Sequence, residues 1–487
     1  MTSSDHYVSI DERLVNLMSI PIAPDCSVIF EVHRPLRMVN EKAYEPDLLA
    51  IGPYHRGKDH LALMERHKLR LLQEMLKREN ETSVERYIIA MRHIEERARK
   101  FYADQFPKIS SNEFIEMMIL DGCFILGLFH SMNEFDPNFK LDWMLPSIIR
   151  DLLLFENQLP FFVLTELYEI SKESLNEQHD DDAHLESESH DQTLLIHGSR
   201  KHSITQVESS TSSNKRESVP LLERALSFFS VNLLFKMNGS GSSHLSTTNI
   251  KHLLGLIHQT ISPSPGEKES ILNATDLQKV GVRHKMIEKL KHPFSLNNNE
   301  GRKLIPHATE LQEAGVRFKK AEHGRNMFEI KFKNGILEIP HLEIVDRTES
   351  IFRNLIAYEQ YSHNMHTRYV TDYVVLMDYL IYTPKDVEVL RQNGIIENWM
   401  GEDEVVSNMF NKLGHYVMLS RFGFYYSDIM KEVNKHCSKR RNVWMAKLRR
   451  DYFNSPWAWL SVLAAMILLL IAIAETTFSV LSYVQQR

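Results

Sequence analysis

The amino-acid sequence predicts a mainly α fold: an irregular multi-helix globular domain with one small antiparallel β-sheet and a single C-terminal transmembrane helix. Apolar residues recur at helical spacing through most of the chain, for example at residues 59–78. Apolar and polar residues alternate around Asn334-Gly335, which is the pattern of a β-hairpin. Residues 455–474 carry no charge, which is the pattern of a membrane span.

The composition is that of a globular protein. The chain has 487 residues, of which 43% are hydrophobic and 25% are charged, so it can bury a sizeable core. The formal net charge of −7 is small for this length, and no nucleic-acid partner is expected. Cys26, Cys123 and Cys437 lie far apart and form neither a disulfide framework nor a paired zinc motif, which favours a reducing compartment.

The first half of the predicted domain covers residues 26–170 and follows an N-terminal tail at 1–25. It opens with an irregular segment rich in proline and glycine, and four helices follow. The third helix is apolar on most faces and is predicted to be buried at the centre, while Pro160 must kink or break the fourth. These helices are expected at residues 59–78, 84–106, 111–131 and 147–170.

Residues 171–219 interrupt the domain. They have few large apolar side chains and many Ser, Asp, Glu and His residues, so we expect a disordered polar insertion. Its histidines could bind a metal weakly, but their irregular spacing favours a solvated loop. They are His179, His184, His190, His197 and His202.

The second half of the domain, residues 220–454, contains a duplication and the hairpin. ATDLQKVGVRHK at 274–285 matches ATELQEAGVRFK at 308–319 in eight of twelve positions, and two copies are too few for a solenoid. The hairpin is expected near residues 328–340, with residues 316–320 as a third strand. Helices are predicted at residues 221–234, 250–261, 348–360, 370–381, 386–391, 405–413 and 427–450, the last being a basic juxtamembrane helix.

Residues 455–487 are predicted to form a membrane anchor. As a helix, the uncharged run spans about 30 Å, the thickness of the hydrocarbon core. The alternative is a buried core helix, which the length and purity of the run disfavour. The anchor residues are Trp457, Trp459, Leu460, Leu463, Ile467, Leu468, Leu469, Leu470, Ile471 and Ile473, with the two tryptophans where an interfacial aromatic belt would lie.

Basic residues crowd the N-terminal side of the run, whereas only Arg487 follows it. The positive-inside rule then predicts a single-pass protein of the plasma membrane or an endomembrane, with its N-terminal bulk in the cytosol. Because the span lies near the last residue, we expect it to insert as a tail anchor. The basic residues could also attract anionic lipids, or serve only to stop transfer. They are Lys435, Lys439, Arg440, Arg441, Lys447, Arg449 and Arg450.

Glu475 marks the expected end of the span. We expect the helix to end at Ala474, which places this carboxylate among the lipid headgroups. If the helix instead continues to Val484, the carboxylate lies inside the membrane, where it is costly and needs a partner.

The sequence contains no recognisable catalytic, cofactor or metal motif, so no catalytic residue, cofactor or metal ligand is predicted. His60 and His67 could share one helix face, but no third ligand is evident and a solvated pair is favoured. Asp121 and Cys123 stand in an apolar helix and are interpreted as structural.

Several segments together resemble a plant family known as domain of unknown function 247. The resemblance runs in order over almost the whole chain from about Cys26. The motifs that carry it are VHRPLRMVNEKAYEPDLLAIGPYHRG (32–57), MERHKLRLL (64–72), EFIEMMILDGCFILGLF (113–129), DLLLFENQLPFFVLTELY (151–168), IPHATELQEAGVRFK (305–319), FEIKFKNGILEIPHLEIVDRTESIFRNLIAYEQ (328–360), YVTDYVVLMDYLI (369–381) and NSPWAWLSVLAA (454–465).

The resemblance implies a land-plant protein with a C-terminal single-pass anchor, and it supplies no catalytic residues. Some grass relatives in this family are associated with pollen self-incompatibility, which suggests recognition or signalling. Two features depart from the family pattern: the extra copy at 274–285, and Glu475 where an uncharged polar residue is expected.

The leading hypothesis is a membrane-tethered, non-catalytic interaction or signalling protein whose partners are the lipid bilayer and another protein. One rival is a membrane-tethered enzyme, for which groups such as Asp121, Glu156 and Asn157 would have to line a closed pocket. A second rival is a lipid-binding module built on residues 435–450. No oligomeric state is predicted.

Overall fold

The computed structural model describes most of the predicted domain and the anchor. The described residues are 28–78, 83–130, 143–172, 220–233, 250–263, 305–322, 326–362, 368–418, 424–439 and 456–485. Most of the predicted polar insertion, the first copy of the duplicated segment and residues 440–450 lie outside them. The chain divides into unit 1, made of Met1–Leu233, Gly239–Thr260 and Arg353–His363, and unit 2, made of Leu234–Asn238, Ile261–Phe352 and Asn364–Arg487.

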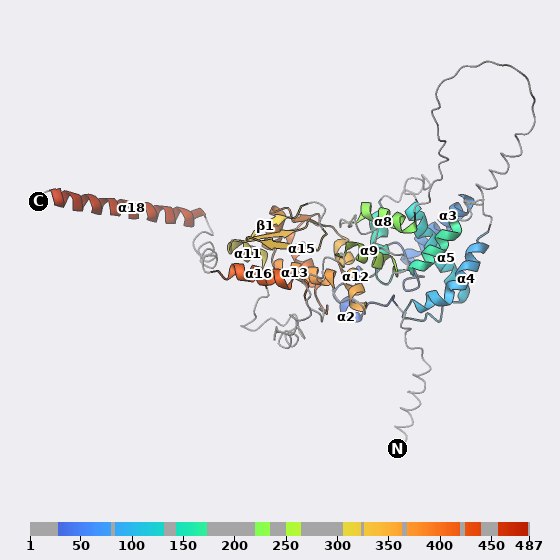
Figure 1. The fold of residues 1–487 in the computed structure, drawn as a ribbon. Coiled ribbons are helices and arrows are strands. Elements are labelled where there is room, and N and C mark those ends of the chain that lie inside the picture. Colours follow the sequence, from blue (N-terminus) through green and yellow to red (C-terminus); the bar gives the residue numbers. More distant parts are fainter. Residues whose placement is uncertain are drawn as a thin grey trace, which may run out of the picture. The chain divides into compact units, whose positions relative to one another are not determined.

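Unit 1 is helical and is built around α5 (Ser111–His130). Every residue from Met117 to Phe129 is buried, which confirms the predicted central helix. Helices α3 and α4 pack along α5 (Figure 1). A capping box starts α5, because the Glu113 N–H donates to Ser110 Oγ and the Ser110 N–H donates to the Glu113 carboxylate.

The other described helices of unit 1 follow the predicted order. Pro160 breaks the predicted fourth helix, so that α6 ends at Leu152, residues 153–160 are irregular, and a new helix occupies residues 161–172. The helix predicted at 84–106 ends earlier, since the Phe101 carbonyl accepts the N–H groups of Val28 and Ile29 instead. The bounds are α2 (Arg34–Arg37), η1 (Glu41–Ala43), η2 (Asp59–Leu61), α3 (Ala62–Arg78), α4 (Glu85–Lys100), α6 (Leu145–Leu152), α8 (Leu221–Asn232) and α9 (Leu253–Ile261).

Unit 2 contains the predicted hairpin. Strand β2 (Lys331–Lys333) pairs antiparallel with β3 (Ile336–Ile339). Asn334 and Gly335 between them have φ values of 54° and 76°, the left-handed values that a type I′ turn requires. Strand β1 (Arg317–Lys320) is the predicted third strand, but it runs parallel to β3, so the sheet is mixed rather than antiparallel. The alternation of residues identifies a strand but carries no information about its direction.

A second sheet was not predicted. Pro340 has no N–H to donate, and it separates β3 from β4 (Leu342–Ile344) within a segment that alternates throughout. Strand β4 then pairs in parallel with β5 (Ile396–Asn398).

Helices complete unit 2. The helix predicted at 386–391 begins earlier, at Pro384, because Thr383 and Asp386 form a capping box. Helix α12 (Thr348–Tyr361) contributes its first residues to unit 2 and the others to unit 1. The remaining bounds are α11 (Ala308–Glu313), α13 (Tyr369–Leu380), α14 (Pro384–Gln392), α15 (Asp403–Leu413) and α16 (Ser427–Cys437).

The C-terminal helix, α18 (Pro456–Gln485), is continuous and about 45 Å long at 1.5 Å per residue (Figure 1). The prediction that it ends at Ala474 was therefore wrong. Thr476 and Thr477 follow the carboxylate, and their hydroxyls donate to the helix's own Ala472 and Ala474 carbonyls, so they add no unsatisfied polar group. Leu463–Ser482 is long and apolar enough to cross a membrane, and no part of it is buried.

Candidate functional site

Several buried polar side chains of unit 1 surround an irregular segment, residues 47–52. The buried Asp151 carboxylate accepts the N–H groups of Asp47, Leu48 and Leu49 at 3.1, 2.8 and 2.9 Å. The Arg150 guanidinium lies 2.8 Å from the same carboxylate. Burial raises the pKa of Asp151 to about 6, although these donors oppose the rise.

Asn157 continues this arrangement along the segment. Its Oδ1 accepts the Ile51 N–H at 2.6 Å, and its Nδ2 donates to the Leu49 carbonyl at 2.8 Å. The same Nδ2 lies 2.9 Å from the Asp151 carbonyl. One side chain therefore satisfies both a donor and an acceptor of backbone that forms no regular secondary structure.

Asp121 and Lys68 hold the end of the segment. Asp121 Oδ2 accepts the Gly52 N–H at 2.8 Å, and its Oδ1 lies 2.5 Å from Lys68 Nζ. Lys68 also donates to the Ala50 carbonyl at 2.6 Å. Burial raises the pKa of Asp121, and the Lys68 charge offsets part of that rise. We call Lys68, Asp121, Asp151 and Asn157 the polar clamp.

A second group adjoins the clamp in the same unit. We call Arg37, Glu45, His55, Lys58 and Glu156 the Glu156 cluster. Glu156 accepts the Val32 N–H at 2.5 Å and forms an ion pair with Arg37. Arg37 Nη1 lies 2.7 Å from Glu45, which also pairs with Lys58. His55 is 2% exposed, and its Nε2 lies 3.3 Å from Glu156 Oε2.

In the Glu156 cluster the carboxylates of Glu45 and Glu156 pair with the cations of Arg37 and Lys58. Burial alone would raise the pKa of Glu45, but the hydrogen bonds from Lys58 and Arg37 outweigh it and lower the pKa to about 2. The cluster has the residue types of an acid–base site, yet its carboxylates are engaged by cations and main-chain donors.

The enzyme hypothesis named Asp121, Glu156 and Asn157, and the structure does bring all three to one region. Their polar atoms, however, are directed at the protein's own backbone and at Arg37 and Lys68. Sequence reasoning did not foresee this role, because the bonded residues lie 53 to 124 positions apart. The available signal was three consecutive polar residues, Glu156–Gln158, directly after an apolar run.

Asn354 ties a distant part of unit 1 to the same region. Its Oδ1 accepts the Phe155 N–H at 2.8 Å, and its Nδ2 donates to the Ala43 carbonyl at 2.8 Å. The second of these bonds joins residues 311 positions apart. Asn354 thus links α12 to the backbone at Ala43 and Phe155.

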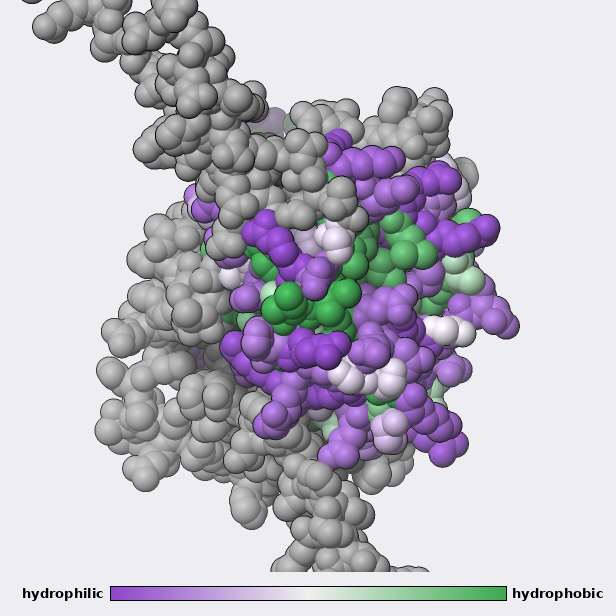
Figure 2. Space-filling view, turned by 90° about the vertical axis from the view of Figure 1, so that its right-hand side faces the viewer, coloured by the Kyte–Doolittle hydropathy of each residue, from purple (hydrophilic) through white to green (hydrophobic). Residues whose placement is uncertain are grey.

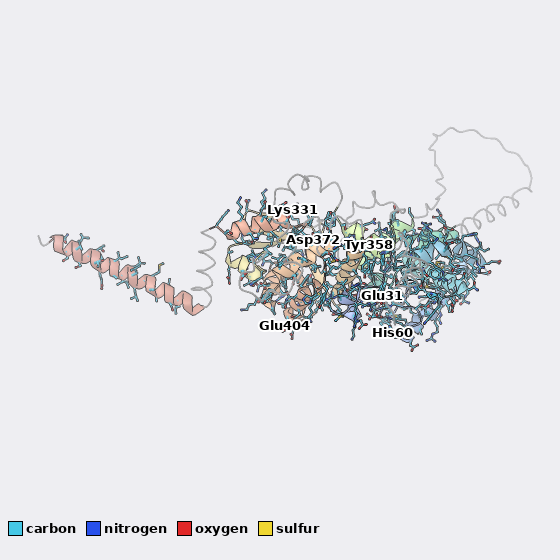
Figure 3. All side chains as sticks on the ribbon, turned by 90° about the horizontal axis from the view of Figure 1, so that it is seen from below. Glu31, His60, Lys331, Tyr358, Asp372 and Glu404 are labelled. Carbon is cyan, nitrogen blue, oxygen red and sulfur yellow. The ribbon has the colours of Figure 1, made fainter. Side chains whose placement is uncertain are left out.

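Two buried histidines pack around Tyr358, which is labelled in Figure 3. The rings of His252 and His258 each lie 5.2 Å from the Tyr358 ring. His258 Nε2 lies 2.8 Å from Glu359 Oε1, and burial lowers the pKa of His252 to about 3. These groups stabilise the interior of unit 1 through ring packing and one buried pair.

Metal-ligand side chains meet once in the described residues, on the second sheet of unit 2. Single ligand atoms of His341, Glu343 and Glu397 lie within 4.8 Å of one another. The register of β4 and β5 places the two glutamates opposite each other, and His341 Nδ1 lies 3.0 Å from the Gly394 carbonyl. Arg347 already interacts with Glu343 electrostatically, and the glutamates are exposed, so we assign no metal to this group.

His60 and His67, which the sequence favoured as a solvated pair, lie in adjoining helices. His60 lies in η2, where its Nε2 is 3.2 Å from the Pro46 carbonyl, whereas His67 lies on α3. Burial, Arg70 and Arg66 lower the pKa of His67. The histidines of the polar insertion lie outside the described residues.

Asp378 on α13 was not singled out by sequence, and burial raises its pKa to about 7. In the unfolded chain the carboxyl titrates near pH 4, so between about pH 4 and 7 the folded state binds the extra proton. The contribution of Asp378 to the free energy of unfolding must therefore fall as pH rises through that window. We expect Asp378→Asn to gain stability relative to the natural chain between pH 5 and 8, on the order of 1–3 kcal/mol.

The measurement is urea unfolding of both full-length chains in mild detergent at pH 5 and pH 8. Taking the difference between the two chains removes the contribution of Asp151, which titrates in the same window. A difference that is the same at both pH values would show that Asp378 ionises normally.

The predicted anchor residues all fall on α18. The side chains of the eight aliphatic ones are at least half exposed, from 50% at Ile467 to 67% at Leu468. Figure 3 shows side chains projecting from all sides of this helix. Trp457 and Trp459 lie in its first turn. The remaining residues of the set are Leu460, Leu463, Leu469, Leu470, Ile471 and Ile473.

Comparison with known proteins finds one family and two curated relatives. The DUF247 profile, described as a plant protein of unknown function, matches residues 29–471. The UPF0481 protein At3g47200 of Arabidopsis thaliana is 28% identical, over 99% of this chain and 92% of its own. The UPF0481 protein At3g02645 of the same plant is 24% identical, over 91% and 88%. No solved structure matches.

Proposed function

This chain belongs to the plant DUF247 family, and from that premise we propose that it is a membrane-anchored protein that acts in recognition or signalling by binding another protein, without catalysis. The observation that carries the proposal is α18. Its large apolar side chains are exposed along the whole window Leu463–Ser482, which water would strongly disfavour. Nine aliphatic residues of the uncharged run contribute roughly −3 to −5 kcal/mol to insertion.

The orientation follows from the charges that flank the helix. The basic residues between Lys435 and Arg450 precede it, and the positive-inside rule keeps that side in the cytosol. Unit 1 and the part of unit 2 up to residue 439 precede the helix in sequence, so we place them in the cytosol. The membrane is the plasma membrane or an endomembrane.

A recognition role is supported by the surface of unit 1. Figure 2 shows apolar side chains gathered in the middle of one face and surrounded by hydrophilic ones. On α3 and α4 of the same unit, Leu63, Leu69 and Ile89 are more than half exposed. Apolar patches of this kind are typical of protein-binding surfaces. The engagement of Glu156 and the polar clamp within the fold also supports binding over catalysis.

The anchor is tested by alkaline carbonate extraction of full-length chains expressed in plant cells. We expect the natural chain to stay in the membrane pellet and the double variant Leu469→Arg, Ile473→Arg to be released. Two arginines near the centre of a span cost about 5–7 kcal/mol, which exceeds the gain from the apolar residues.

The matched control is Leu63→Arg, Leu69→Arg on α3, which adds the same charges to exposed positions of unit 1. This variant should stay in the pellet. Release of the natural chain by carbonate would overturn the proposed anchor.

A further inference from the structure

Continuity of α18 places Glu475 inside the apolar window rather than at its border. The carboxylate lies roughly 10 Å from the Ser482 end of the window and about 18 Å from the Leu463 end, at 1.5 Å per residue. A glutamate side chain is too short to reach water from that depth. Such groups are costly in lipid and are retained where a partner satisfies them.

One row of residues through Glu475, which we call the Glu475 face, is small or hydroxylated apart from one leucine, and Ile471 and Phe478 flank Glu475 at its edge. The spacing within the row alternates between four and three residues over the whole window, which is the period at which two helices supercoil with a left-handed twist. The face consists of Ser461, Ala465, Leu468, Ala472, Glu475, Ser479 and Ser482. Small side chains at these positions let two helix backbones approach closely in a membrane.

The rest of the helix surface is different. It is dominated by large apolar side chains, including Leu463, Leu470, Ile473 and Phe478, each more than half exposed. Thr476 and Thr477 also lie off the Glu475 face, and their hydroxyls are already bonded to the helix backbone. Lipid can therefore cover the rest of the surface, whereas the Glu475 face needs a polar partner.

We propose that α18 pairs in parallel with the α18 of a second copy of this chain through the Glu475 face. The proposal rests on the anchor proposed above, because two anchored copies enter the membrane in the same orientation. In a parallel two-fold pair, each residue of the face lies opposite the same residue of the second copy. A protonated carboxyl both donates and accepts a hydrogen bond, as does a serine hydroxyl, so this face is complementary to its own copy without any basic residue.

The test uses full-length chains that carry a donor or an acceptor fluorescent protein at the N-terminus, reconstituted together into phosphatidylcholine vesicles. Energy transfer is followed as lipid is added to dilute the protein. We expect Glu475→Leu to lose half of its transfer at about tenfold less added lipid than the natural chain, and Glu475→Gln to resemble the natural chain because an amide also donates and accepts.

The matched control is Thr477→Leu, which makes a similar polar-to-leucine change on the opposite side of the helix. It should retain the natural dilution curve. If Glu475→Leu retains that curve as well, or the natural chain gives no transfer at any dilution, the pairing is overturned. In the second case, a basic residue in the span of a different protein becomes the expected partner.

Flotation of the same vesicles separates this inference from the anchor. Natural chain that floats without energy transfer refutes only the pairing. Natural chain that fails to float refutes the anchor, and the pairing falls with it. Glu475→Leu makes the span more apolar, so lost transfer in that variant cannot come from failed insertion.

Discussion

Replacing Gly52 with alanine should destabilise unit 1 by about 4 kcal/mol or more. Gly52 has a φ of +72°, which costs an L-residue about 1–2 kcal/mol. A Cβ there would lie 2.7 Å from the Gln158 carbonyl oxygen and 3.0 Å from the Tyr102 hydroxyl. Because the first of these atoms is backbone, the segment must move, and the Gly52 N–H would leave Asp121.

Gly57 provides the matched control. Its φ is +82°, but a Cβ at that position meets nothing within 4 Å. Gly57→Ala should therefore destabilise unit 1 only through the cost of a positive φ in an L-residue, about 1–2 kcal/mol. Amide hydrogen exchange of α5 in the full-length chain measures the stability of unit 1 without averaging over unit 2. Equal effects of the two substitutions would show that residues 51–53 are not held against residue 158.

Replacing Lys68 with methionine should lower the free energy of unfolding of unit 1 by about 3–5 kcal/mol, because it leaves the buried Asp121 carboxylate without its cation. Lys68 is 1% exposed, so water cannot take the place of its ammonium group. The Ala50 carbonyl would also lose a donor. The pKa of Asp121, already raised by burial, should rise further once the Lys68 charge is gone.

Two further variants make this result specific to the ion pair. Lys77→Met removes an exposed lysine from the same helix and should change stability by less than about 0.5 kcal/mol. Asp121→Asn in the Lys68→Met background should recover part of the loss, since no charge then remains buried. If the second substitution lowers the stability of unit 1 further instead, Asp121 stabilises the fold mainly by accepting the hydrogen bond from the Gly52 N–H. Hydrogen exchange of α5 is again the measurement.

The sequence predicted those parts of the fold that depend on local pattern. The apolar helix α5, the break at Pro160 and the turn at Asn334-Gly335 each follow from residues that are neighbours in the chain. Strand direction in the first sheet and the pairing of β4 with β5 depend on partners far away in sequence. Periodicity within one strand carries no information about them.

The same distinction explains what was missed at the candidate site. Asp121 was interpreted as structural, but its partners Lys68 and Gly52, which come from two other segments, were not predicted. Glu156 and Asn157 were considered only as residues that could line a pocket, because nothing local shows that a carboxylate or amide will bind backbone a hundred residues away. The end of α18 was misplaced because a charge was taken as a helix boundary.

The bonds made by Asn354 join residues that the ribosome synthesises at widely separated times. Ribosomes add about 5–20 residues per second, so the Asn354 amide is synthesised roughly 15–60 s after the Ala43 carbonyl that it will bind. Asp151 is synthesised roughly 5–20 s after residues 47–49, whose N–H groups it accepts. Helix α5 packs against α3, α4 and α8, so part of its apolar surface is uncovered until α8 has been made. The nascent chain should therefore depend on chaperones until α8 emerges, well before the anchor is synthesised.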